Sequence, residues 1–444
     1  MGQCLGSSHS REVTLNTKAN SGDPVPPKSP PPKTAVNVED DDDLYEQYQL
    51  TKGSSMFLPG DDQDLDADMQ DLDNALKDIE AEMDEEDDFD HPVYSSSGET
   101  YQVGDAVVYA PDMEKSIAFD LTDDEGGKTS TLTFGYKTLA GKTGGGLYGK
   151  ANQDSLCVVR TKDRPNQAIF SVFDGHGPNG EHASHYCRMN FKRNYVVQKS
   201  KYPDATPEEL MERTLAKLDR GFGATDPDAT NVDPIVSGTT AVSIFFDGKN
   251  IISANVGDSR AIMGTKVNGV VEAFPLTDDH KPNRPSEMSR IKQTSAKVLT
   301  ERELRGMTPK DDPDQKVYVC RQRRGEIIYA VLFSRSLGDV DAHRNLGVIS
   351  DPEFERAVID DSKEQCVIIA SDGIWDMMSN QEVADLVFKI GDPLKASEEI
   401  VSIAATRWAD SEERRRDDIT VTVVGIGEAF AQQNGLRREG SFLM

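Results

Sequence analysis

Long apolar runs are missing from this sequence of 444 residues, of which only 36% are hydrophobic. No stretch of about 18 apolar residues occurs, so we expect no transmembrane helix, and the N-terminus lacks the apolar core of a signal peptide. Five cysteines, an odd number in a long chain, do not form a disulfide framework and favour a reducing compartment. Positive charge is scarce too. A net charge of −29 argues against sequence-independent binding to nucleic acid.

The negative charge is concentrated near the N-terminus. Between Glu39 and Asp90, 22 acidic residues stand against two lysines, a net charge of −20. The segment before it, 21–35, is rich in proline, which favours an extended chain. Low hydrophobicity and the mutual repulsion of its acidic residues predict disorder over 36–95. We therefore predict a short targeting segment, a Pro-rich then acidic disordered region, a globular domain and a C-terminal tail, over 1–20, 21–93, 94–430 and 431–444.

One stretch of the acidic region has a helical pattern. Its apolar residues are spaced 4, 3, 4, 3 and 4 apart, which predicts an amphipathic helix over 65–83. The simplest interpretation is an acidic surface helix. The alternative is a helix that docks on a partner or on this protein's own globular domain. Three heptads are too few to assign a coiled coil. The apolar positions are Leu65, Met69, Leu72, Leu76, Ile79 and Met83.

The globular domain alternates short β-rich runs with helical stretches. Several strands follow one another without an intervening helix, which favours sheets with helices packed outside them over a doubly wound parallel sheet. Asp247-Gly248 lies between two of these strands and predicts a hairpin turn. The expected strands are Ser155–Arg160, Ala168–Phe173, Thr239–Phe246, Asn250–Val256, Ile327–Phe333, Cys366–Ala370 and Ile419–Ile426. The expected helices span 180–199, 207–222, 285–296, 380–390 and 395–409.

Aspartates stand at the ends of five of these strands. A single Asp beside a Gly is usually a turn residue, because its side chain bonds to its own backbone. Five at apolar strand ends are harder to explain in that way, and would converge if the strands lie side by side. Clustered carboxylates repel one another unless cations neutralise them, and oxygen ligands select Mg²⁺ or Mn²⁺. The five are Asp154, Asp174, Asp258, Asp372 and Asp417.

Eight short motifs occur in an order that resembles the metal-dependent, type 2C (PPM) protein serine/threonine phosphatases. The resemblance runs from about Gly149 to Gly427 and implies an α/β fold. In that fold a central β-sandwich of two mostly antiparallel sheets is flanked by helices, with a two-metal site at one end. The motifs are Asn152-Gln153-Asp154, Phe173-Asp174-Gly175-His176-Gly177, Ser237-Gly238-Thr239-Thr240-Ala241, Asn255-Val256-Gly257-Asp258-Ser259-Arg260, Asp279-His280-Lys281-Pro282, Ser334-Arg335-Ser336-Leu337-Gly338-Asp339, Ala370-Ser371-Asp372-Gly373-Ile374-Trp375-Asp376 and Arg416-Asp417-Asp418-Ile419.

The resemblance implies metal-ligand roles at seven positions. Asp174 matches the carboxylate that bridges two Mg²⁺ or Mn²⁺ ions, and Gly175 matches a backbone carbonyl ligand. Asp372 and Asp417 match ligands of the first ion. Asp154 matches an acidic residue near the water molecules on the metal ions. Asp258 and Asp376 match the two carboxylates of a weaker third-ion position.

Three further positions surround the expected ions. His176 matches the general acid of the family, and its two flanking glycines place it on a loop. Lys150 lies near the position where many members have a phosphate-binding arginine, displaced by one residue. Gln153 stands where many members have a glutamate, so this position adds no charge to the second metal site.

The implied reaction is hydrolysis of phosphoserine and phosphothreonine on proteins by water activated between two divalent ions. The expected protein is a monomeric signalling enzyme whose partners are phosphoprotein substrates. One alternative is a catalytically weak phosphatase-like scaffold that binds partners through its acidic segment. A calcium-binding acidic protein is disfavoured, because no D-x-D-x-D-G loop with a closing Glu occurs.

Two groups of basic or polar residues have a simpler interpretation than catalysis. His280 and Arg284 are expected to hold a turn before the 285–296 helix. The trio Arg321, Arg323 and Arg324 is expected to be solvated surface, with contact to a phosphopeptide as the alternative.

The first seven residues, Met1-Gly2-Gln3-Cys4-Leu5-Gly6-Ser7, resemble an acylation signal. Removal of Met1 would expose Gly2 for N-myristoylation. One myristoyl chain binds membranes only marginally, so a second signal is needed, and Cys4 is well placed for S-palmitoylation. We therefore expect the protein on the cytoplasmic side of a membrane, the plasma membrane in the first instance, and otherwise in the cytoplasm.

Overall fold

The computed structural model describes residues 101–103, 106–108, 116–122, 128–143, 148–161, 164–222, 234–308, 315–323, 326–411 and 415–432. The predicted regions 1–20 and 21–93, the helix over 65–83 and residues 433–444 lie outside these ranges. So do Gly2, Cys4 and Arg324, together with the side chain of Arg323. No helix within the described ranges is both long and apolar enough to cross a membrane.

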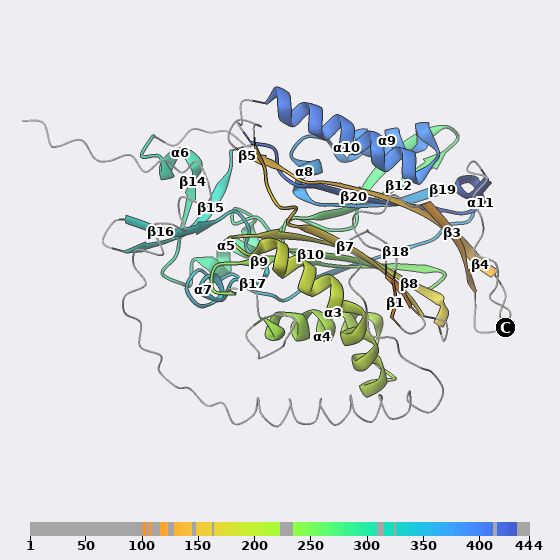
Figure 1. The fold of residues 1–444 in the computed structure, drawn as a ribbon, viewed down its shortest axis with the longest axis horizontal. Coiled ribbons are helices and arrows are strands. Elements are labelled where there is room, and N and C mark those ends of the chain that lie inside the picture. The colour runs from red at the N-terminus through yellow and green to blue at the C-terminus, as the bar shows by residue number, and fades with distance from the viewer. Residues whose placement is uncertain are drawn as a thin grey trace, which may run out of the picture. The chain divides into compact units, whose positions relative to one another are not determined.

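Two antiparallel sheets form the centre of the domain (Figure 1). The first has seven strands in the order β17-β9-β8-β10-β11-β18, with β7 also paired to β8. Its strands are β7 (Asp154–Thr161), β8 (Arg164–His176), β9 (Gly238–Thr239), β10 (Ala241–Phe246), β11 (Asn250–Val256), β17 (Leu337–Gly338) and β18 (Glu353–Val358).

The second sheet has six strands in the order β13-β12-β19-β20-β4-β3. Its central strand β20 is buried at every position, because both of its faces are covered. The strands are β3 (Ser116–Thr122), β4 (Lys128–Leu139), β12 (Arg260–Val267), β13 (Val270–Pro275), β19 (Glu364–Ala370) and β20 (Ile419–Ile426).

The two sheets pack face to face over an apolar core. Phe170 of the seven-stranded sheet makes edge-to-face contacts with Phe134 of the other sheet and with Phe246 of its own, at ring-centroid distances of 5.3 and 5.6 Å. Leu156, Val172, Val367 and Val424 belong to the same cluster. Alternation along each strand places these side chains inward and their neighbours outward.

Helices cover both outer faces of this sandwich (Figure 1). On the seven-stranded sheet lie α3 (Gly180–Lys201) and α4 (Pro207–Gly221), where Thr206 and Glu209 form a capping box. On the six-stranded sheet lie α9 (Asn380–Ile390) and α10 (Pro393–Asp410). Gly391 ends α9 with φ of 74°, a left-handed conformation that glycine adopts without strain.

A smaller lobe adjoins the sandwich. A three-stranded sheet packs with neighbouring helices around Val319, Val331, Phe333 and Leu346. Its elements are β14 (Lys297–Thr300), β15 (Val317–Arg323), β16 (Glu326–Val331), α5 (Pro285–Ile291), α6 (Glu301–Leu304) and α7 (Val340–Asn345). The remaining short elements are β1 (Tyr101–Val103), β2 (Ala106–Val108), β5 (Lys142–Thr143), β6 (Tyr148–Gly149), α8 (Asp372–Trp375) and α11 (Glu428–Gln432).

The predicted fold class is confirmed. Three local features of the structure differ from the prediction. The helix expected over 285–296 ends at Ile291. The strand expected over Thr239–Phe246 is divided into β9 and β10 at Thr240. The N–H of Thr240 donates to the carbonyl of Asp174 in β8 at 2.8 Å. The hairpin of β12 and β13 was missed, although its Asn268-Gly269 turn has φ of 52° and 83° at both residues.

Candidate active site at one end of the sandwich

Strand ends from both sheets bring the predicted aspartates to one end of the sandwich. Asp154 opens β7 and is the register partner of Asp174 near the end of β8. Asp258 lies between β11 and β12, Asp372 follows β19, and Asp417 precedes β20. The carboxylates of Asp154, Asp372, Asp417 and Asp258 all repel that of Asp174, so these groups are close in space. These four carboxylates therefore lie near that of Asp174.

Burial and repulsion from neighbouring carboxylates raise the pKa values of Asp174 and Asp372. Burial, followed by repulsion from Asp154 and Asp372, holds the pKa of Asp174 well above its usual range. Burial, followed by repulsion from Asp376 and Asp258, does the same to the pKa of Asp372. These carboxyls are costly to ionise without a nearby cation.

Asp154 is the most informative member of the group. Burial, with repulsion from Asp418, raises its pKa to about 7. Its Oδ2 atom accepts a hydrogen bond from the Ser371 hydroxyl at 2.7 Å, whereas its Oδ1 atom is buried and has no hydrogen-bond partner. A buried acceptor without a partner is destabilising. The site therefore lacks one positive or donating group at this oxygen.

The donor set fits a hard divalent cation. It consists of carboxylate oxygens with the Gly175 carbonyl, and oxygen ligands are the ones that Mg²⁺ and Mn²⁺ select. The unpartnered Oδ1 of Asp154 and the raised pKa of Asp174 both point to a missing positive charge. Within the described ranges, no three His, Cys, Asp or Glu side chains converge closely enough to hold an ion as they stand. The number of ions is therefore not defined by this geometry.

The space at Gly175 is very restricted. A Cβ atom there would lie 2.0 Å from the carbonyl oxygen of Gly180 and 2.6 Å from that of Gln153. Gly175 also donates its N–H to the Gln153 carbonyl at 3.0 Å. Any side chain at this position would displace the backbone that carries Asp174 and His176.

Lys150 lies inside the site but is paired. Its Nζ atom is 3.4 Å from Oδ1 of Asp417 and 3.1 Å from Oδ2 of Asp418. Burial raises the pKa of Asp417, but the opposing effects of Lys150 and Arg415 leave it below its usual value. Asp417 is thus an anion over the ordinary pH range, with a lysine beside it.

Asp418 is a site residue that sequence reasoning passed over. Its carboxylate accepts hydrogen bonds from the backbone N–H of Gly141 at 2.5 Å and of Gln153 at 3.0 Å. It is 3% exposed and ties β20 to the two segments that precede β7. Its presence in the motif Arg416-Asp417-Asp418-Ile419 was the available signal.

Asp258 forms an ion pair with Lys281, a partner that the sequence analysis did not predict. The Nζ atom of Lys281 lies 2.5 Å from Oδ2 of Asp258, and Asp258 is 5% exposed. Burial opposes ionisation of this lysine, yet attraction by Asp258 and Asp372 raises its pKa above the usual value. Burial raises the pKa of Asp376 even though Lys281 opposes the shift. Lys281 thus supplies positive charge to this part of the site.

His176 is held in one orientation. Its Nε2 atom is 2.6 Å from Oδ2 of Asp339, and its ring lies against Phe333 with a centroid distance of 4.3 Å. Asp339 is fully buried and has φ of 43°, an uncommon conformation for a residue with a side chain. Burial raises the pKa of Asp339, but attraction and hydrogen bonding by His176 lower it overall. No role had been predicted for Asp339.

Gln153 lies at the edge of this loop. Its Nε2 atom donates to the Gly177 carbonyl at 2.8 Å and to Oε2 of Glu181 at 3.3 Å. The amide therefore links the beginning of β7 to the loop after His176. A glutamate at this position would place a carboxylate against both acceptors.

The contacts of His280 and Arg284 agree with a structural interpretation. His280 is fully buried, and its Nδ1 atom accepts a hydrogen bond from the backbone N–H of Gly257 at 3.0 Å. Arg284 donates to Oε2 of Glu353 at 2.6 Å. Of the predicted basic trio, Arg321 forms an ion pair with Asp341 at 2.9 Å.

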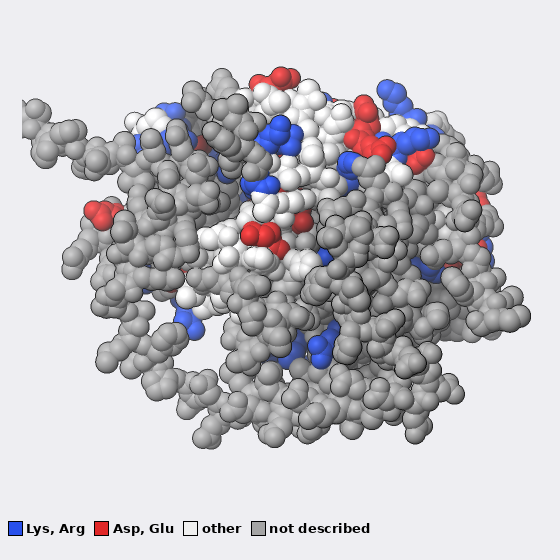
Figure 2. Space-filling model, in the orientation of Figure 1, with Lys and Arg blue, Asp and Glu red and all other residues white. Residues whose placement is uncertain are grey.

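The charged side chains of this domain are interspersed on the face that Figure 2 shows. Red carboxylate groups near the middle of the view are flanked by blue lysine and arginine groups.

Comparisons with known proteins agree with this geometry. The family model described as protein phosphatase 2C matches residues 145–411, more than half of the chain. A probable protein phosphatase 2C 35 of Arabidopsis thaliana is 29% identical over 62% of this chain and 79% of its own length. A probable protein phosphatase 2C 52 of the same plant is 32% identical over 58% of each chain. This chain thus spans little more than half of some relatives.

Solved structures show the same fold. A serine-threonine phosphatase 2C from Toxoplasma gondii superposes with a TM-score of 0.53 at 19% identity, over 71% of this chain and 99% of its own. A Caenorhabditis elegans sex determining protein superposes with a TM-score of 0.50 at 20% identity, over 66% of this chain and 64% of its own. The chain belongs to the protein phosphatase 2C family of serine/threonine phosphatases.

Proposed function

We propose that this chain hydrolyses phosphoserine and phosphothreonine on proteins in a reaction that depends on Mg²⁺ or Mn²⁺. The observation that carries the proposal is the buried group of carboxylates at the end of the sandwich. Asp174 and Asp372 have strongly raised pKa values because of burial and mutual repulsion, and one oxygen of Asp154 has no partner. Divalent ions would relieve both conditions at once.

The residues that would hold the ions are those that the strand ends assemble. Asp174 and the carbonyl of Gly175 come from β8, Asp372 from the start of α8, and Asp417 from the residues before β20. Asp154 offers its free Oδ1 atom, and a weaker third ion would use Asp258 and Asp376. When bound, such ions activate water and neutralise charge on a phosphoryl group.

The protein's own groups would complete the reaction. His176, oriented by the bond between its Nε2 atom and Asp339, would donate a proton to the departing serine or threonine oxygen. Lys150 keeps Asp417 ionised as a ligand. Gly175 allows the backbone to approach without a side chain in the way.

The test is phosphate release by the full-length chain from phosphoserine, phosphothreonine and phosphotyrosine peptides. Hydrolysis of the first two should require Mn²⁺ or Mg²⁺ and stop with a chelator, and phosphotyrosine should be a poor substrate. Activity that survives complete removal of divalent ions would reject the mechanism. A lack of any activity with Mn²⁺ would favour the phosphatase-like scaffold that binds through its acidic segment.

We also propose that the N-terminus anchors the protein to a membrane through a myristoyl chain on Gly2 and a palmitoyl chain on Cys4. The support comes from the sequence Met1-Gly2-Gln3-Cys4 and from the need for two signals in stable anchoring. Cell fractionation tests it. Gly2→Ala should be soluble and Cys4→Ser partly and loosely bound, whereas a fully soluble wild type would reject the anchor.

A further inference from the structure

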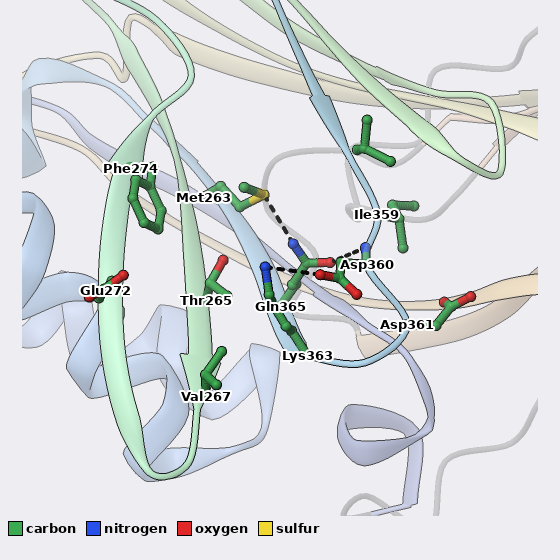
Figure 3. Close-up of a pocket in the computed structure, with 11 residues that line it drawn as sticks. Met263, Thr265, Val267, Glu272, Phe274, Ile359, Asp360, Asp361, Lys363 and Gln365 are labelled. Carbon is green, nitrogen blue, oxygen red and sulfur yellow. Dashed lines mark hydrogen bonds and ion pairs between the residues drawn. The ribbon is translucent and has the colours of Figure 1, made fainter.

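A groove lies beside the β12–β13 hairpin. Among the described strands, β13 is an edge strand of the six-stranded sheet and β18 is an edge strand of the seven-stranded sheet. The groove has a volume of about 600 Å³ and is lined by Met263, Thr265 and Phe274 of the hairpin and by Val358 and Ile359. Figure 3 shows Phe274 and Ile359 on opposite sides of it. Met263 packs against the core between the two sheets, so the groove continues that core outward.

The groove is rich in exposed apolar side chains. Four of the six large hydrophobic residues that are exposed in the described part of the chain line or flank it. Single exposed apolar residues are normal on protein surfaces, but a cluster along a groove marks an interaction site. The four are Val267 at 42%, Val270 at 63%, Phe274 at 42% and Val358 at 63% exposure.

The two sheet edges beside the groove differ. On β13, the side chain of Gln381 from α9 accepts from the N–H of Ala273 at 3.1 Å and donates to the carbonyl of Val271 at 3.0 Å, so it covers that edge. β18 has one strand neighbour, β11, among the described strands. No described strand pairs with its other edge, and an edge of this kind can accept an added strand.

The charge of the groove is negative. Its charged residues are Glu272, Asp360 and Asp361 against Lys363, and Lys363 pairs with Asp360 at 2.9 Å. Figure 3 shows Asp361 directed away from that pair. Within the described ranges, Glu272 and Asp361 take part in no ion pair, so two carboxylates remain for a cationic partner. The acidic segment between Glu39 and Asp90, with a net charge of −20, would be repelled.

We propose that this groove binds an extended, cationic and apolar segment of a partner protein, which adds as a strand along β18. Alternate side chains of that strand would lie over Met263 and Phe274, and its Lys or Arg residues would meet Glu272 and Asp361. On β12, Met263 is the lining residue nearest to the carboxylate site, and it lies about 16 Å along the strand from Asp258 at about 3.3 Å per residue. Docking would therefore leave the carboxylate site open. This proposal does not depend on the proposed reaction.

The test uses the full-length chain and a fluorescein-labelled peptide, KVRIKVRI. Its controls are EVDIEVDI and a form of KVRIKVRI that is N-methylated at alternate residues. We expect saturable one-to-one binding of the first peptide by fluorescence anisotropy, weaker at high salt, and little binding of the others. A failure of KVRIKVRI to saturate by about 1 mM, or equal binding of EVDIEVDI, would overturn the proposal.

Variants locate the site. Phe274→Ser and Glu272→Lys should each weaken binding about tenfold or more. The matched control is Val196→Ser on α3, another exposed apolar residue, which should leave binding unchanged. Both groove positions lie on an exposed hairpin, so circular dichroism should show intact folding. Unchanged affinity in both groove variants would overturn the location.

Hydrogen exchange tests the edge that is used. The peptide should slow exchange of backbone amides in residues 353–358 of β18 and leave those of β13 unchanged, because Gln381 already covers that edge. Protection confined to any other part of the chain would overturn strand addition at β18.

Discussion

The Nε2 atom of His176 lies 2.6 Å from Oδ2 of Asp339, a fully buried residue 163 positions further along the chain. The pair joins His176, which is the last residue of β8 and not in a loop as expected, to Asp339, the residue before α7. Gly238 passes directly behind the carboxylate, because a Cβ atom there would lie 2.2 Å from Oδ2 of Asp339. The Asp339 carboxylate therefore packs against the backbone of Gly238. The imidazole ring of His176 is positioned by that carboxylate and by Phe333.

The first prediction concerns this pair. Asp339→Asn should lower kcat on a phosphoserine peptide by about 10- to 100-fold, a part of the 10²–10⁴ that general acids contribute. An aryl phosphate with a good leaving group should be affected much less, because its departure needs no proton. The control is Asp341→Asn, which removes the charge that pairs with Arg321 and accepts from Asn345 but leaves His176 and Asp339 in place. An equal loss on both substrates would indicate a structural role for Asp339.

The second prediction concerns the metal ligands. Asp174→Ala and Asp372→Ala should abolish activity, since each removes a charge that the ions need. Isothermal titration calorimetry should show weakened Mn²⁺ binding in both. Glu326→Ala, on an exposed strand end, is the control and should bind Mn²⁺ as the wild type does. Substantial turnover by either site variant at saturating Mn²⁺ would contradict the assignment.

The third prediction concerns the stability of the metal-free protein. Burial and repulsion raise the pKa of Asp154 to about 7, above the value of 3.8 that applies to an unperturbed carboxyl. The folded state therefore binds this proton more tightly, so its contribution to stability is complete below about pH 4 and disappears as pH rises through 7. In chelator, the Tm should fall between pH 5 and pH 8.

Two comparisons check this pH dependence. Asp154→Asn should show a smaller fall in Tm, because it has no charge to acquire at this position. Added Mn²⁺ should raise Tm more at pH 8 than at pH 5, where protons compete for the carboxylates. A Tm in chelator that rises from pH 5 to pH 8 would show that these carboxyls are not the dominant groups.

The fourth prediction concerns a buried ion pair outside the site. Glu287 is fully buried, accepts from Arg335 at 2.8 Å and pairs with Arg290 at 2.5 Å. Burial raises the pKa of Glu287, but hydrogen bonds from Arg290 and Arg335 lower it well below the usual range. Glu287→Gln should cost about 3–5 kcal/mol of unfolding free energy, because it leaves Arg335 buried without its main partner.

Denaturant unfolding measures this cost, with Glu326→Gln as an exposed control. Since the folded pKa of Glu287 is depressed, its contribution is present above the unfolded value of about 4.5 and declines as pH falls below it. The difference between wild type and Glu287→Gln should therefore shrink in acid. A difference that is constant from pH 7 to pH 3 would contradict this account.

Much of this protein follows from local sequence. Short apolar runs predict strands such as β11 and β20, whose bounds were predicted as observed and which are buried along nearly their whole length. The helix α9 was also bounded correctly, since Ser379 and Gly391 mark its two ends. The Asp residues at strand ends indicated a shared site, and the structure forms it from strand ends of both sheets.

Other features were decided by the tertiary structure. The partners of His176, Lys150 and Asp258 lie on distant segments, and no local spacing specifies which carboxylate or ammonium group will meet them. The groove beside β18 is likewise formed by residues of two sheets, Met263 and Phe274 from one and Val358 from the other. Periodicity determines which side of a strand is apolar, but only the packing of the two sheets decides whether that side is covered.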